Sequence, residues 1–218
     1  SKGFFERFDV VNQNDAFLED EDFGWEESVL AFAWGNALRV KESGEIPFKG
    51  GNRFFRFTKD AKNIPWLQKD PRMCITLKTW IKIMDKEPAI VFTYRHPLEV
   101  AMSLQKRAGR MELRKGLHLW IAYNMRAIQN SRGLCIVKTS NTKLLANPNT
   151  ELQRISDELT AKCKVVAPPH KIKEKEVEKF IDPSLQHQHA DDKGQKEVLE
   201  EHNGGTCVAY SFQSKHEK

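Results

Sequence analysis

An arginine, a histidine and a proline directly follow an apolar run at residues 89–94. If this run is a strand and the proline opens a helix, Arg95 stands beside a helix N-terminus, where the peptide dipoles already present partial positive charge. A cation in that place needs a counter-charge, either from Glu99 or from an anion outside the chain. Ser103 falls on the polar face of the expected helix, so its hydroxyl and the Arg95 guanidinium could hold one phosphate.

The residue types leave a second interpretation of this stretch open. Arg95 could simply pair with Glu99, and Ser103 could be a solvated helix residue, because surface ion pairs and exposed serines are common and contribute little energy. The same doubt applies to His96, which could act as a base or could be a structural partner of the arginine.

A second group of charged residues follows the apolar run at 64–68. Lys69, Asp70 and Arg72 stand at this expected strand end, where the ligand pocket of an α/β sheet is expected. An aspartate between two cations is held in its charged form, which makes it a weak base. The alternative is an Asp-Pro-Arg turn held by local hydrogen bonds.

These residues depend on the elements that position them. An apolar run without alternation predicts a parallel strand buried on both faces at 89–94, and brief apolar runs predict strands at 64–68 and 134–137. Helical spacing and end signals predict helices at 10–18, 25–38, 76–84, 97–107, 113–132 and 148–160, with a loop followed by a helix at 41–63. Strands that alternate with helices indicate an α/β fold, a mainly parallel sheet flanked by helices, in which ligands bind outside the carboxyl ends of the strands.

In the helix expected at 113–132, we expect one apolar side to face the core. Its residues recur at helical spacing, and they are Leu113, Leu117, Trp120, Ile121, Met125 and Ile128.

Composition sets the limits on domain number and partners. The chain has 218 residues, of which 39% are hydrophobic and 30% charged, as expected for one globular domain. We place this domain at residues 1–183 and expect a polar, flexible tail at 184–218. The 35 basic and 30 acidic residues are mixed along the chain, which favours an anionic ligand in one pocket over nucleic-acid binding.

The cysteines and histidines suggest neither a disulfide framework nor a metal site. The four cysteines are widely separated and lack zinc-finger spacing, so we expect incidental thiols in a reducing, cytoplasmic compartment; they are Cys74, Cys135, Cys163 and Cys207. The tail histidines have no evident scaffold, and no metal is expected. No stretch approaches the roughly 20 apolar residues of a membrane span, and no signal peptide is evident.

The segment YRHPLEVAMSLQKR, which contains Arg95 and Ser103, resembles the 3′-phosphate-binding segment of sulfotransferases that use 3′-phosphoadenosine 5′-phosphosulfate (PAPS). Further segments across residues 2–185 resemble a bacterial-type branch of that family in the same order: KGFFE, QKDPRMCITLKTW, GLHLWIAYN, LLANP and FIDPSL. The resemblance implies a P-loop-NTPase-like architecture and sulfuryl transfer from PAPS to a hydroxyl or amine of a small-molecule or carbohydrate acceptor. It also implies that Arg95 and Ser103 hold the 3′-phosphate of PAPS or of its product, 3′-phosphoadenosine 5′-phosphate (PAP). The resemblance further implies that residues 69–72 occupy the place of the catalytic base, so that Asp70 would have to serve as the base while Lys69 and Arg72 supply positive charge.

The chain departs from the family pattern in its 5′-phosphosulfate loop. No strand followed by a Gly/Ser/Thr-rich turn precedes KGFFE, and neither KGGNR nor NGGTC is a credible substitute. We therefore expect an N-terminally incomplete sulfotransferase fold that keeps part of the nucleotide site without efficient turnover. The alternatives are a non-catalytic nucleotide-binding or interaction module of the same fold and a small-molecule kinase of related architecture.

Overall fold

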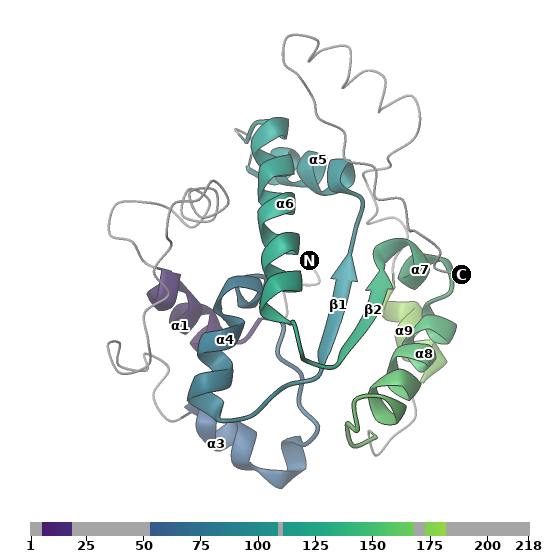
Figure 1. Ribbon diagram of the computed structural model, residues 1–218. Coiled ribbons are helices and arrows are strands. Elements are labelled where there is room, and N and C mark those ends of the chain that lie inside the picture. The colour runs from purple at the N-terminus through teal and green to yellow at the C-terminus, as the bar shows by residue number, and fades with distance from the viewer. Residues whose placement is uncertain (1–5, 19–52, 109–110, 168–172, 182–218) are drawn as a thin grey trace, which may run out of the picture.

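The computed structural model describes residues 6–18, 53–108, 111–167 and 173–181 (Figure 1). The helix expected at 25–38 and the tail expected at 184–218 lie outside these residues. The described elements, in chain order, are α1 (Phe8–Leu18), α3 (Arg53–Lys59), the 3-10 helix η1 (Ala61–Asn63), α4 (Met73–Met84), β1 (Ile90–Tyr94), α5 (Pro97–Ala108), α6 (Leu113–Asn130), β2 (Ile136–Ser140), α7 (Asn141–Ala146), α8 (Pro148–Ala161) and α9 (Glu174–Phe180).

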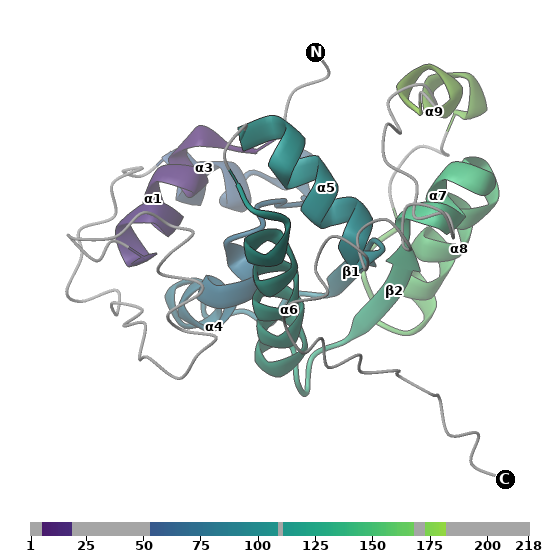
Figure 2. The same ribbon diagram turned by 90° about the horizontal axis from the view of Figure 1, so that it is seen from above.

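A parallel pair of strands forms the centre of the fold. β1 and β2 run in register from Ile90 opposite Ile136 to Tyr94 opposite Ser140, and the connection between them passes through α5 and α6. Figures 1 and 2 show α4, α5 and α6 on one side of the strands and α7, α8 and α9 on the other. The predicted α/β class, with a parallel sheet flanked by helices, is confirmed at this level.

The helix termini follow the expected local chemistry. α5 begins at Pro97, whose missing N–H costs nothing in a first helical turn; Glu99 lies in that turn, and Lys106 and Arg107 lie in the last one. α8 also begins at a proline. The predicted helices at 10–18, 76–84, 97–107, 113–132 and 148–160 are therefore confirmed with small shifts in their ends.

The strand predicted at 64–68 is wrong. Irregular chain follows η1 there, and the side chains of Ile64 and Leu67 are 50% and 80% exposed. A parallel strand is stabilised by burial on both faces, which these side chains lack. Pro65 also has no N–H to give to a sheet ladder.

The buried face predicted for α6 is wrong in part: Leu113 is buried and Leu117 packs against a buried cluster, but other predicted positions face solvent. Ile121, Met125 and Ile128 are about half exposed, at 46%, 53% and 56%. The buried positions are instead mostly small, namely Leu113, Gly116, Leu119, Ala122 and Ala127. A Cβ at Gly116 would lie 2.9 Å from Ala101 Cα, so this close approach of α5 and α6 requires a glycine and decides which side of α6 faces inward.

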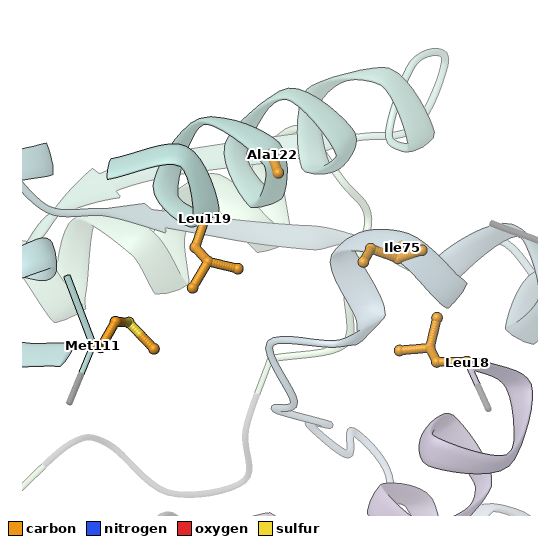
Figure 3. Packing of buried hydrophobic residues seen from close by; sticks show 5 residues of the cluster. All are labelled: Leu18, Ile75, Met111, Leu119 and Ala122. Atoms are coloured by element: carbon orange, nitrogen blue, oxygen red, sulfur yellow. The ribbon is translucent and has the colours of Figure 1, made fainter. Parts of the chain in front are cut away.

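The core consists of small clusters between helices. One of them joins α1, α4 and α6 (Figure 3) through Leu18, Ile75, Met111, Leu119 and Ala122. Another packs three rings edge to face, with the Trp80 ring centroid 5.9 Å from that of Phe17 and 5.2 Å from that of Phe54. The interior thus fixes α4 against both α1 and α6.

The expectation that all the cysteines are unpaired thiols is wrong for two of them. Cys135 and Cys163 form a disulfide with a Cα–Cα distance of 5.4 Å, across 28 positions in sequence. The chain returns along α8 to the start of β2, which brings the pair together. Cys74 is a free thiol, and Cys207 lies outside the described residues.

Candidate functional site

Arg95 lies between the carboxyl end of β1 and the first turn of α5 (Figure 1). Its Nε donates to Glu99 Oε2 at 2.7 Å, and its side chain is 25% exposed. Its backbone carbonyl accepts a hydrogen bond from Trp120 Nε1 of α6 at 3.0 Å. The sequence leaves two possible counter-charges for Arg95, namely Glu99 or an anion outside the chain. In the structure, the Arg95 guanidinium forms an ion pair with Glu99.

Ser103 lies on the exposed surface of α5. It follows Glu99 by four positions, so the two residues share one side of the helix with a rise of about 6 Å between them. The structure therefore places Arg95 and Ser103 along one side of α5, with Glu99 between them.

Asp70 is a fully buried carboxylate in the loop before α4. Its Oδ2 accepts from Asn14 Nδ2 at 2.9 Å, and its Oδ1 accepts from the Arg72 backbone N–H at 2.9 Å and from Arg72 Nη1 at 3.2 Å. Asn14 Oδ1 in turn accepts from Thr76 and Trp80 of α4. Because both Asp70 oxygens serve these bonds and the side chain is 0% exposed, the geometry suits a structural role better than proton abstraction from a bound acceptor.

Lys69 and Arg72 do not converge on one point. Arg72 Nε lies 2.6 Å from Asp15 Oδ1 of α1, whereas Lys69 Nζ lies 2.6 Å from Glu6 Oε1. Burial alone would lower the pKa of Arg72, but Asp70 and Asp15 outweigh it and raise the pKa. The structure thus joins Arg72 to Asp70 and directs Lys69 to a different carboxylate.

Two partly buried groups lie near this loop. Burial raises the pKa of the Cys74 thiol to about 11, so the thiol stays protonated at neutral pH and does not suit a nucleophile. Burial also raises the pKa of Tyr123 on α6, which lies within electrostatic reach of Cys74 and Arg72. Trp120 of the same helix donates a hydrogen bond to the Arg95 carbonyl. Helix α6 therefore contacts both the Arg95 region and the neighbourhood of Arg72.

A further charged group, which joins α8 to β2, is not among the site residues predicted from the sequence. Glu151 of α8 accepts from Thr139 Oγ1 of β2 at 2.6 Å and from Arg154 Nη2 and Nε at 2.6 and 2.8 Å. Arg154 Nη2 also donates to the Lys138 carbonyl of β2 at 2.8 Å. The spacing of Glu151 and Arg154 within one helix is a readable signal, but nothing local in sequence indicates the contact with β2.

A cavity of about 680 Å³ between α8 and α9 includes none of the site residues predicted from the sequence; it is lined by Asn149, Thr150, Gln153, Arg154, Asp157, Glu158, Ala161 and Glu174. In the part of the chain that the structure describes, no group of three or more histidine, cysteine or acidic side chains could hold a metal ion. The tail histidines lie outside that part.

No helix among the described residues combines the length and the apolar character that a membrane crossing requires.

The candidate site consists of two separate groups. One is the β1–α5 junction with Arg95, Glu99 and Ser103, and the other is the buried network around Asp70. No protein-family model, curated protein or solved structure matches this chain.

Proposed function

We propose that the chain is a sulfotransferase-like protein that binds PAPS or PAP at the β1–α5 junction and transfers sulfate to a hydroxyl or amine acceptor. The observation that carries this proposal is the position of Arg95 at the carboxyl end of a parallel strand, directly before a helix that also carries Ser103. Ligands of α/β sheets bind at that end of the strands, and helix N-termini favour anions.

The expected roles follow from the chemistry of each group. Arg95 offers a planar fork of donors to the 3′-phosphate, and the exposed Ser103 hydroxyl offers one further donor. Lys69 remains 52% exposed and is the better placed of the two loop cations to meet a leaving phosphate. The burial of Asp70 and the hydrogen bonds to both of its oxygens argue against proton transfer by this group, so we do not assign the base to it.

Calorimetric titration with PAP tests the binding half of this proposal. We expect Arg95→Ala to weaken binding at least about tenfold, since hydrogen bonds to charged groups contribute roughly 1.5–3 kcal/mol. Arg132→Ala is the matched control, because Arg132 is an exposed arginine before the amino end of β2, at the opposite end of the sheet. Equal affinities of wild type and Arg95→Ala would refute the assignment of Arg95.

A non-catalytic nucleotide-binding module is the second candidate. The closed hydrogen bonding of Asp70 favours it, because a chain without an accessible base can bind the nucleotide and still fail to transfer sulfate. An assay with radiolabelled PAPS and a panel of hydroxyl and amine acceptors separates the two candidates. PAP binding without measurable transfer supports the module, and measurable sulfation excludes it.

A further inference from the structure

Glu99 accepts a hydrogen bond from the Arg95 guanidinium, the group that would bind a phosphate. The Glu99 carboxylate lies 2.7 Å from Arg95 Nε, and the two side chains are only 14% and 25% exposed. A partly buried pair is screened less by salt than a surface pair. Glu99 also lies in the first turn of α5, where the helix dipole favours a negative charge.

We propose that Glu99 is an internal ligand of Arg95, which the 3′-phosphate of a nucleotide must displace, and that Glu99 thereby sets the charge selectivity of the site. This inference rests on the proposed function, because it assumes that a 3′-phosphate reaches Arg95. A carboxylate carries one charge, whereas a phosphate monoester carries up to two and offers three acceptor oxygens. A phosphate can therefore replace Glu99 on Arg95 where a weaker anion cannot.

The internal ligand has a measurable cost for binding. When the competent state of a site is only partly populated, the apparent affinity falls by that fraction. Glu99→Gln keeps the shape and the hydrogen-bonding capacity of the side chain and removes its charge. We expect this variant to bind PAP about fivefold more tightly than wild type, equivalent to about 1 kcal/mol, the upper end for such a pair.

The effect must be specific to the 3′-phosphate. Adenosine 5′-phosphate lacks this group, so its affinity is expected to stay within about twofold in Glu99→Gln. The charge-matched control is Glu87→Gln, because Glu87 is exposed and precedes the amino end of β1, at the opposite end from Arg95. A general gain from the lost negative charge would appear equally in both variants.

The test is calorimetry of wild type, Glu99→Gln, Glu87→Gln and Arg95→Ala with PAP and with adenosine 5′-phosphate, together with the NMR signals of arginine Nε–H groups without ligand. In the free wild-type protein, the Arg95 Nε–H signal should be shifted by its carboxylate partner, and this shift should be lost in Glu99→Gln. Thermal unfolding of each variant establishes that it is folded.

Tighter PAP binding by Glu99→Gln alone supports the inference. If wild type binds PAP and Arg95→Ala weakens it, but Glu99→Gln binds equally or more weakly, then Glu99 orients Arg95 and the inference fails while the proposed function stands. If PAP binds none of the four proteins, the proposed function fails and the inference fails with it.

Discussion

Glu151 shows how one carboxylate can hold a helix against a strand. It accepts hydrogen bonds from Arg154 on its own helix and from Thr139 on β2. Arg154 also donates a hydrogen bond to the Lys138 carbonyl of β2. The hydrogen bonds from Arg154, and then the one from Thr139, lower the pKa of Glu151 from 4.5 to about 2. The charged form is therefore the one that the fold stabilises.

The pH dependence of stability follows from the sign of this shift. A carboxyl group with a lowered pKa in the folded state contributes stability above its unfolded pKa, and that contribution is lost as the pH falls toward the folded pKa. We expect Glu151→Gln to lower the melting temperature at pH 7 and to approach wild type between about pH 4.5 and pH 2. Thermal unfolding followed by circular dichroism at pH 7, 4 and 2.5 measures this. A constant difference across the three pH values would contradict the role assigned to the Glu151 charge.

At the scale of elements, the contact of α5 with α6 depends on one small residue. A Cβ at Gly116 would meet Ala101 Cα at 2.9 Å and Ala101 Cβ at 3.0 Å, and the first of these is a backbone atom that cannot rotate away. The two helices can approach this closely only because residue 116 has no side chain.

Gly116→Ala therefore tests which of two opposing effects is larger. Higher helix propensity would stabilise the variant by about 1 kcal/mol, whereas overpacking costs typically 1–3 kcal/mol. We expect net destabilisation of about 1 kcal/mol, because the clash is with backbone and the whole α5–α6 contact must shift. Urea unfolding of wild type and variant gives the difference, and a variant more stable than wild type would show that α5 and α6 are not packed this closely.

The same helix shows what the sequence could and could not predict. Periodicity correctly predicts α6, but the large apolar residues indicate a face that is only partly buried, because the close approach to α5 at Gly116 requires a residue without a side chain. The apolar run at 64–68 has the composition of a strand, but local composition alone cannot distinguish a buried run from an exposed one.

The contacts of the candidate site can likewise be predicted from the sequence only in part. The interaction of Arg95 with Glu99 joins residues four positions apart, so local spacing made it one of the two expected outcomes. The hydrogen bond from Asn14 to Asp70 spans 56 positions, and the role of Asp70 depends on it. No local pattern indicates such a partner, so the sequence leaves open whether Asp70 is a base or part of a structural turn.

For the whole molecule, the Cys135–Cys163 disulfide closes the unit formed by β2, α7 and α8. The bond ties the start of β2 to the turn after α8, while Thr139 and Glu151 join the same two elements further along. Disulfides persist mainly in oxidising compartments, so this bond weighs against the cytoplasmic location expected from the sequence.

The disulfide should contribute substantially to the stability of this unit. In the chain-entropy model, a cross-link across 28 positions stabilises the folded state by roughly 3–4 kcal/mol. We expect reductant to lower the urea unfolding midpoint of wild type. The double variant Cys135→Ser, Cys163→Ser should have a midpoint close to that of reduced wild type, and reductant should not change it. Mass spectrometry of the non-reduced digest should find the peptides of the two cysteines joined. Separate alkylation of Cys135 and Cys163 in the native protein, or a wild-type midpoint insensitive to reductant, would show that hydrogen bonding alone holds α8 to the sheet.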